Sequence, residues 1–287
     1  MAQFCPAPRI HTTSTHNGET HMAMNGIRLI AADLDGTLLL DGAREVPDEV
    51  FDQIRGLAAS GVRFLAASGR QYYNLRRLFA PVADDILYLC ENGSLVMLDD
   101  EVLLKRCMPR DLGEEVCRAI MADPRLELLV SGVHTNYAFA SSPAFIDHLV
   151  NEVGTRTTPI DSLDQIHEDF LKVSFYAKDP ADLDAAAPAF EERFGDALKV
   201  VVSGASWFDV MCRGVDKGSA LAAISGELGI AAADMAAFGD NFNDAEMLDY
   251  VGHPFLMESG QPALRGLNDR IELVGSVPAK LTALLAE

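Results

Sequence analysis

Short apolar runs and helical apolar spacing alternate through the first part of the chain. Ile27–Ala32 and Val62–Ala67 are apolar runs of strand length. Between them, Pro47–Ser60 has apolar residues at helical spacing and is followed by Gly61, a common helix end. Tyr73–Phe79 is again helical in pattern. The order strand, helix, strand predicts a βαβ unit and hence a parallel sheet.

The same rhythm returns after residue 213. Lys217–Leu228 is predicted as a helix that ends at Gly229, Met235–Phe238 as a strand and Asp244–Tyr250 as a helix. The last predicted elements are the strands Pro254–Met257 and Arg270–Val274 and the helix Pro278–Leu285. The two stretches together predict an α/β fold with a doubly wound, Rossmann-like parallel sheet.

The middle of the chain has a different pattern. Ser94–Leu98 and Glu101–Cys107 flank the acidic pair Asp99–Asp100, which favours a hairpin. The predicted elements that follow are helices near 112–121, 144–153 and 181–194, and strands near 126–131, 135–139, 171–177, 198–202 and 206–211. Adjacent strand pairs favour antiparallel pairing, so this stretch is predicted as an inserted α+β cap domain. The predicted boundaries are 1–25 for a disordered N-terminal extension, 26–93 and 211–287 for the core, and 94–210 for the cap.

The charge of the chain excludes some partners. Lys and Arg number 23 against 43 Asp and Glu, a formal net charge of −20. Such a field repels nucleic acid and anionic membrane surfaces, and no apolar run reaches membrane-spanning length. A bound divalent cation would reverse the sign locally, so an anionic small-molecule partner stays compatible. Five cysteines without CxxC spacing indicate free thiols and a cytoplasmic location. No pattern indicates an oligomeric state.

Two carboxylates follow the first predicted strand. Asp33 and Asp35 are separated by one residue, and Gly36 then permits a sharp turn. Residues two apart on an extended chain point the same way, so both carboxylates are expected in a crevice at the end of a parallel sheet. Such a pair is typical of a cation site or of a nucleophile with an acid–base partner. The alternative interpretation is an Asp-rich turn that caps a helix.

Three further segments place polar groups in matching positions. Ser68-Gly69-Arg70 follows the second predicted strand, and Lys217 lies at a helix start, where the helix dipole opposes a cation. The loop 239–244, which contains Asp240, Asn243 and Asp244, follows the strand at 235–238. Taken singly, each has a bland interpretation: a Ser-Gly turn, an exposed first-turn lysine and a polar loop before a helix.

Together these residues resemble the four motifs of the haloacid dehalogenase superfamily. The chain is most similar to the Cof-like phosphatases, in which an α/β cap is inserted between the second and third motifs. Glu91–Gly93 and Trp207–Met211 are also similar to that group, and the resemblance covers about residues 27–287. One departure is Met257–Gly260, which stands where many relatives carry a Met-x-Asn-Ala turn.

The resemblance implies a role for each matching residue. Asp33 would attack phosphorus, and Asp35 would protonate the leaving oxygen and then activate water. The implied catalytic set is Asp33, Asp35, Ser68 and Lys217. The implied substrate-binding set is Ser68, Gly69, Arg70 and Asn92. The implied Mg²⁺ ligands are Asp33, Asp240 and the backbone carbonyl of Asp35, with Asn243 and Asp244 around them.

The expected reaction is Mg²⁺-dependent hydrolysis of a small-molecule phosphate monoester. The resemblance makes sugar phosphates the first expectation and leaves flavin mononucleotide, pyridoxal phosphate and nucleotides open. Two other functions stay open as well. A mutase would pass the phosphoryl group to a sugar hydroxyl, and a sensor would bind a phosphorylated ligand without turnover.

Overall fold

The computed structural model describes residues 26–204 and 206–286, so the predicted disordered extension at 1–25 lies outside the described residues. The chain divides into two compact units. The core unit comprises residues 26–70, 75–104 and 216–286 of the described chain, and the inserted unit comprises Gln71–Asn74 and Lys105–Val215.

The core unit is built on an eight-stranded sheet in the order β14-β13-β12-β1-β2-β3-β4-β5. Its strands are β1 (Leu29–Ala32), β2 (Arg63–Ala67), β3 (Leu87–Cys90), β4 (Leu95–Leu98), β5 (Glu101–Lys105), β12 (Met235–Gly239), β13 (His253–Met257) and β14 (Glu272–Val274). The six strands from β14 to β3 pair in parallel, and β4 pairs antiparallel with β3. All four residues of β1 are buried, as expected of a central strand.

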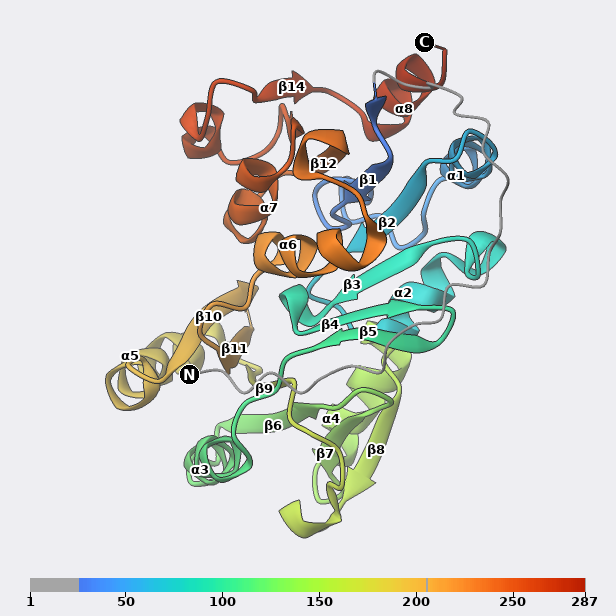
Figure 1. Cartoon of the computed structure of the whole chain (residues 1–287). Coiled ribbons are helices and arrows are strands. Elements are labelled where there is room, and N and C mark those ends of the chain that lie inside the picture. The colour runs from blue at the N-terminus through green and yellow to red at the C-terminus, as the bar shows by residue number, and fades with distance from the viewer. Residues whose placement is uncertain (1–25, 205, 287) are drawn as a thin grey trace. The chain divides into compact units, whose positions relative to one another are not determined.

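Helices cover both faces of this sheet (Figure 1). The helices α1 (Asp48–Ala59) and α8 (Val277–Leu285) pack against each other. The helices α6 (Lys217–Leu228) and α7 (Ala245–Tyr250) form a second packed pair. Leu29 and Ala31 of β1 share one apolar cluster with Leu221 of α6. A further helix, α2 (Tyr72–Leu78), follows β2. The predicted doubly wound α/β core is confirmed.

The predicted hairpin at 94–107 belongs to the core sheet and not to the inserted domain. β4 pairs with β3 in the register Leu89↔Val96, and Val96 is fully buried in the core cluster. The inserted unit comprises Gln71–Asn74 and Lys105–Val215, so β4 and most of β5 lie in the core unit. A hairpin pattern does not reveal which sheet its strands join, since that choice depends on non-local pairing.

The inserted unit contains a six-stranded sheet in the order β10-β11-β9-β6-β7-β8. Its strands are β6 (Leu126–Ser131), β7 (Asn136–Phe139), β8 (Thr157–Ile160), β9 (Lys172–Ala177), β10 (Leu198–Gly204) and β11 (Trp207–Cys212). Its helices are α3 (Arg110–Met121), α4 (Pro143–Asp147) and α5 (Pro180–Phe194). Antiparallel pairing is confirmed for β6 with β7 and for β10 with β11.

One strand of the inserted unit was not predicted. β8 has the sequence Thr-Thr-Pro-Ile, exposes its two central residues, and pairs in parallel with β7 at the edge of the sheet. Proline is tolerated at a sheet edge, where one side of the strand needs no hydrogen-bond partner. The short, partly polar sequence has no apolar alternation, so only the neighbouring strand identifies it.

Two expectations from composition can be compared with the described residues. Four of the five cysteines lie there, and all four are free thiols: Cys90, Cys107, Cys117 and Cys212. Among the helices described, none combines the length and the apolar character needed to cross a bilayer.

Candidate active site

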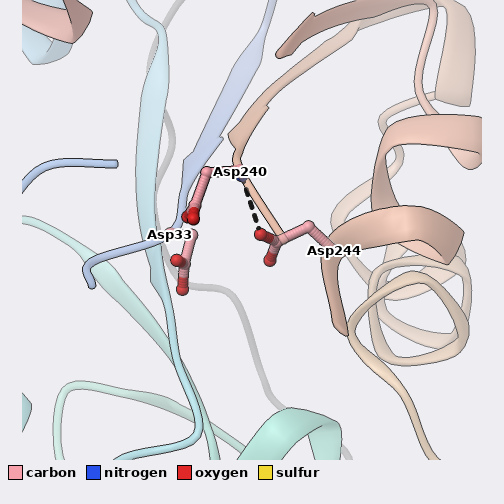
Figure 2. Close-up of side chains that lie close together, drawn as sticks. All are labelled: Asp33, Asp240 and Asp244. Atoms are coloured by element: carbon pink, nitrogen blue, oxygen red, sulfur yellow. Dashed lines mark hydrogen bonds between the residues drawn. The ribbon is translucent and has the colours of Figure 1, made fainter. Parts of the chain in front are cut away.

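Asp33 and Asp240 lie at the carboxyl ends of neighbouring parallel strands. β1 and β12 pair in the register Ala32↔Phe238, and the backbone N–H of Asp33 donates to the Phe238 carbonyl at 3.0 Å. Both strands therefore end at the same edge of the sheet. Figure 2 shows the Asp33 and Asp240 side chains next to each other, with Asp244 approaching from the other side.

A buried lysine joins two of these carboxylates. The Nζ atom of Lys217 lies 2.5 Å from Oδ1 of Asp33 and 2.6 Å from Oδ1 of Asp244. The side chains of Lys217 and Asp244 are fully buried, and Asp33 is 5% exposed. An ammonium group removed from water in this way is stable only with close anionic partners, and Lys217 has two.

The start of α6 positions this lysine. The Asp216 side chain caps the helix by accepting a hydrogen bond from the Ser219 backbone N–H at 2.6 Å. Gly218 allows close contact between α6 and α7, because a Cβ atom there would collide with the Glu246 carbonyl. The positive end of the helix dipole opposes a cation at Lys217, and the two ion pairs offset that opposition.

Asp244 also organises the loop after β12. Its Oδ2 atom accepts hydrogen bonds from the backbone N–H groups of Asp240 at 3.0 Å and Asn241 at 3.1 Å. Asp240 is held in turn by Thr37, whose hydroxyl donates to Oδ1 at 2.8 Å. Gly36 has φ +88°, and a Cβ atom there would collide with the Asp240 carboxylate. The turn after Asp35 thus requires glycine both for its backbone and for space.

The cluster of Asp33, Asp240, Asp244 and Lys217 carries more negative than positive charge. Burial, followed by repulsion from Asp244, raises the pKa of Asp33 well above its usual value despite the Lys217 partner. Burial likewise raises the pKa of Asp240. Burial alone would lower the pKa of Lys217, but Asp244 and Asp33 outweigh it and raise that pKa, so the lysine is charged.

Three carboxylates around one ammonium suit a divalent cation. Asp33, Asp240 and Asp244 each offer one oxygen, and these oxygens lie within 4.8 Å of one another. Carboxylate oxygens are the ligands that Mg²⁺ prefers, and a cation would neutralise part of the negative charge of these three carboxylates. This cluster could therefore hold a metal ion. Asp244 is a member of this cluster together with the predicted ligands Asp33 and Asp240, whereas the sequence predicted it only around the metal.

Asp35 and Arg70 form an ion pair of their own. The guanidinium of Arg70 donates from Nε to Oδ2 of Asp35 at 2.9 Å and from Nη2 to Oδ1 at 2.5 Å. Both side chains are partly exposed. The Asp35 carboxylate is thus held by arginine in a fork, whereas the Asp33 carboxylate faces lysine. Sequence spacing placed both carboxylates at one strand end but did not reveal their separate partners.

Ser68 directly follows β2, the strand that pairs with β1 on the side opposite β12. β2 pairs in parallel with β1 in the register Ala32↔Ala66, so Ser68 follows β2 one residue beyond the level of Asp33. Ser68 is buried, and its Oγ atom accepts a hydrogen bond from the Arg70 backbone N–H at 3.2 Å. The predicted position at a second strand end is therefore correct.

Three further predicted residues, Gly69, Asn92 and Asn243, lie close together. The amide of Asn243 donates to Oδ1 of Asn92 at 3.3 Å, and a Cβ atom at Gly69 would press against the Asn92 amide. Asn92 has φ +53°, a conformation that asparagine tolerates better than most residues. Asn243 contacts Asn92, while Asp244 occupies the carboxylate cluster. Thr37 was not predicted as a site residue, although it directly follows Asp35 and Gly36 in the sequence and its hydroxyl donates to Asp240.

Comparisons with known proteins agree with this arrangement. Residues 30–272 match the model of the haloacid dehalogenase-like hydrolases. The 5-amino-6-(5-phospho-D-ribitylamino)uracil phosphatase YbjI of Escherichia coli is 28% identical over 238 residues, which cover 83% of this chain and 88% of that protein. The HMP-PP phosphatase of Escherichia fergusonii is 27% identical over 249 residues, covering 86% and 90%.

A solved structure has the same fold. The crystal structure of a protein from Eubacterium rectale superposes with a TM-score of 0.80 at 24% identity, covering 90% of this chain and 99% of that one. Because the family model spans residues 30–272, the resemblance first drawn from the four motifs is confirmed. The chain belongs to the haloacid dehalogenase-like hydrolases.

Proposed function

We propose that this protein hydrolyses phosphate monoesters of small molecules, with Mg²⁺ as cofactor and Asp33 as nucleophile. The observation that carries this proposal is the contact of Lys217 Nζ with Asp33 Oδ1 at 2.5 Å, inside a cluster of three carboxylates. A buried carboxylate at a strand end, next to a fixed ammonium, can attack an electrophile whose negative charge that ammonium neutralises.

Two steps account for the reaction. One Asp33 oxygen forms a bond to phosphorus while the bond to the leaving alcohol breaks, which leaves an aspartyl-phosphate. Asp35 gives its proton to the leaving oxygen, then takes a proton from the water that attacks the aspartyl-phosphate and releases inorganic phosphate. The Arg70 fork on Asp35 holds this carboxylate apart from the Lys217 pair, so the two aspartates have different tasks.

The donors around Asp33 would bind the phosphoryl oxygens. The Ser68 hydroxyl lies one residue beyond the level of Asp33 on the adjacent strand and supplies a hydrogen bond. Lys217 supplies positive charge. Arg70, Gly69 and Asn92 line the same loops and are proposed to contact the substrate. Asn243 supports Asn92 through its amide.

The metal would be held by Asp33 and Asp240, with the backbone carbonyl of Asp35 as a further ligand and Asp244 next to them. When bound, Mg²⁺ neutralises charge on the transferring phosphoryl group and orients it. The donor set fits this ion because it consists of carboxylate and carbonyl oxygen atoms, and three carboxylate oxygens lie within 4.8 Å of one another.

Hydroxyl-rich phosphates are the proposed substrates. Both named relatives are phosphatases, and the name of the first gives a phosphorylated ribitylamino compound as its substrate. The chain's charge of −20 argues against nucleic acid as substrate. Free thiols at Cys90, Cys107, Cys117 and Cys212 suit a reducing compartment such as the cytoplasm.

Phosphate release from a compound panel tests the proposal. Sugar and polyol phosphates, nucleotides, cofactor phosphates and acetyl phosphate are incubated with wild type and Asp33→Asn in the presence of Mg²⁺. We expect release by wild type and a loss of roughly 10⁴-fold or more in the variant. Asp41→Asn is the matched control, because Asp41 is exposed and already has the positive φ of +53° that asparagine tolerates.

The outcomes separate the candidate functions. Near wild-type turnover by a folded Asp33→Asn protein would remove Asp33 as nucleophile. Phosphorus NMR that shows an isomerised phosphate ester in place of free phosphate would identify a mutase. Thermal stabilisation by a compound that is never turned over would identify a sensor.

A further inference from the structure

The three clustered carboxylates of the core unit are held by different partners. Lys217 forms ion pairs with Asp33 and Asp244. The Asp240 carboxylate is held by a neutral donor instead, because the Thr37 hydroxyl donates to its Oδ1 atom at 2.8 Å. Thr37 is 1% exposed, so water has little access to replace this hydroxyl if it is removed. The orientation of Asp240 therefore depends on Thr37.

The turn after β1 fixes the direction of the Thr37 hydroxyl. The backbone N–H of Thr37 donates to the Leu34 carbonyl at 3.2 Å, and the N–H of Gly36 donates to the Leu39 carbonyl at 3.0 Å. The N–H of Leu39 closes the turn by donating to the Leu34 carbonyl at 2.7 Å. Threonine is branched at Cβ, which restricts its side-chain rotamers. Backbone and rotamer thus both limit where the hydroxyl can point.

A second loop holds the backbone of Asp240. The N–H of Gln261 donates to the Asp240 carbonyl at 2.8 Å, and the N–H of Asp240 donates to Oδ2 of Asp244 at 3.0 Å. Gly260 lies against the same peptide: a Cβ atom there would be 2.7 Å from the Asp240 carbonyl oxygen and 2.9 Å from its Cα atom. Only glycine allows so close an approach without a shift of the backbone.

This glycine belongs to the segment in which the sequence departs from its family. Met257–Gly260 stands where many relatives carry a Met-x-Asn-Ala turn, so Gly260 takes the place of the alanine. An alanine would not fit in the arrangement found here, because its methyl group would collide with the Asp240 backbone. Two independent features, a buried hydroxyl and a glycine contact, therefore act on the same aspartate.

We propose that Thr37 is a positioning residue for Asp240 as a metal ligand, and that Gly260 and Gln261 complete a clamp on the Asp240 backbone. This inference rests on the metal of the proposed function. Mg²⁺ requires nearly ideal octahedral geometry, so a ligand that is already oriented binds it better than one that rotates. Hydrogen bonds to a ligating carboxylate supply that orientation. Lys217 serves Asp33 and Asp244, and the clamp serves Asp240.

Thr37→Val is the discriminating variant, because valine has the shape of threonine without the hydroxyl. Calorimetry on the metal-free protein measures the Kd of Mg²⁺ alone, without substrate or turnover. Thr37→Val should raise this Kd about tenfold, the low end of the effect of such supporting residues. Thr37→Ser keeps the hydroxyl and should bring the Kd back towards the wild-type value.

Thr282→Val is the matched control for this substitution. Thr282 is an exposed residue of α8 in the same unit, and its hydroxyl also donates one hydrogen bond, to the Pro278 carbonyl at 3.1 Å. The control makes the same change and loses a hydrogen bond of the same kind, so the Kd of Mg²⁺ should stay at the wild-type value.

Gly260→Ala tests the clamp from the backbone side and leaves Thr37 intact, so it also serves if Thr37→Val does not fold. The added methyl group must displace either the loop or Asp240, and the Kd of Mg²⁺ should rise. Gly266→Ala is its matched control, because a Cβ atom at Gly266 has no neighbour within 4 Å. An unchanged Kd in Gly260→Ala would overturn the part given to this loop.

The role of Thr37 would be overturned by an unchanged Kd in Thr37→Val, or by a Thr37→Ser protein that binds Mg²⁺ as weakly as Thr37→Val. Direct binding separates this inference from the proposed function. If wild type binds Mg²⁺ but releases no phosphate from any compound, the proposed function fails, yet the comparison of Kd values still decides the clamp. A wild type that binds no Mg²⁺ overturns the clamp, whatever its activity.

Discussion

The core unit and the inserted unit each bury a group of polar side chains, but they do so in different places on their sheets. The core cluster of Asp33, Lys217, Asp240 and Asp244 lies at strand ends and a helix start. In the inserted unit, a group that we call the polar strip lies within strands, on alternate positions of one sheet face; it consists of Ser131, Asn136, Lys172, Ser174 and Asp209. Strand-end loops can change without disturbing the sheet, whereas a residue on a sheet face must also pack against its neighbours.

The two groups also differ in charge. The core cluster has three carboxylates and one ammonium, and burial followed by repulsion from Asp244 raises the pKa of Asp33. The strip pairs one carboxylate with one ammonium. An excess of carboxylates attracts a cation and, through it, a phosphate, whereas a carboxylate paired with one ammonium has its charge compensated within the protein. The comparison indicates how one chain of net charge −20 can recognise an anionic substrate.

The largest expected effect comes from Lys217→Met. It leaves the buried carboxylates Asp33 and Asp244 without their cation, which should cost about 3–5 kcal/mol of unfolding free energy. Activity should fall roughly 10³-fold, because a fixed charge next to the nucleophile is lost. Urea unfolding in the presence of chelator and phosphate release measure the two effects. Lys105→Met, which removes a partly exposed pair with Asp169, should cost less than about 1 kcal/mol.

If Lys217→Met and Lys105→Met were equally stable, burial would not be what distinguishes the core cluster from a surface ion pair. The core cluster would then have no energetic feature that sets it apart from other ion pairs in the molecule.

Asp35→Asn should have the next largest effect. Without the proton donor, hydrolysis of sugar phosphates should slow by roughly 10²–10³-fold. Acetyl phosphate needs no proton on its leaving group, so it should still phosphorylate Asp33 while the second step stalls. Intact-mass spectrometry should then detect phosphorylated protein. Equal rates on both substrates and no phosphoprotein would contradict the roles given to Asp33 and Asp35.

Magnesium should stabilise the fold in a pH-dependent way. Without metal, the raised pKa values of Asp33 and Asp240 mean that ionising these groups destabilises the folded state. The destabilisation is complete above the folded-state pKa values and absent below those of the unfolded chain. Mg²⁺ at a hundredfold excess over its Kd should add about 2.7 kcal/mol near neutral pH, and less at acidic pH because protons compete.

Thermal melts with Mg²⁺ or with chelator, at near-neutral and at acidic pH, measure this effect. Asp240→Asn should reduce the shift. An equal shift in Asp240→Asn and in wild type would place the metal elsewhere.

The smallest effect is expected within the polar strip. Ser174→Ala removes the hydrogen bond from the hydroxyl to Asp209 at 2.6 Å and should cost about 2 kcal/mol. Ser141→Ala, at an exposed residue of the same unit, should change stability by less than about 0.5 kcal/mol. Chemical unfolding of both variants measures the difference. Equal stability would mean that Ser174 does not hold the carboxylate, which would weaken the contrast between the two units.

The core site was predictable because its residues are contiguous with strand ends. Asp33, Ser68 and Asp240 each directly follow a strand, and parallel neighbours bring those ends together. The separation of Asp35 from Asp33 was not predictable. It depends on Arg70, which reaches Asp35 across 35 positions of sequence.

The boundary of the insertion and the strand β8 were also beyond the sequence. β4 and β5 have the same apolar pattern whichever sheet they join, and β8 gains its identity only by pairing with β7. Strand pairing is chosen by non-local packing, so a local pattern cannot specify it.

The sequence by itself determined the doubly wound core, the order of its motifs and the carboxylates near Asp33, because each of these is encoded in short stretches where a strand ends or a helix begins. Only the tertiary structure decided which carboxylate faces Lys217, which faces Arg70, and that Ser131, Asn136, Lys172, Ser174 and Asp209 form one strip. Those five residues come from four strands whose order and register are set by burial of the opposite, apolar face, and no single stretch of sequence contains that information.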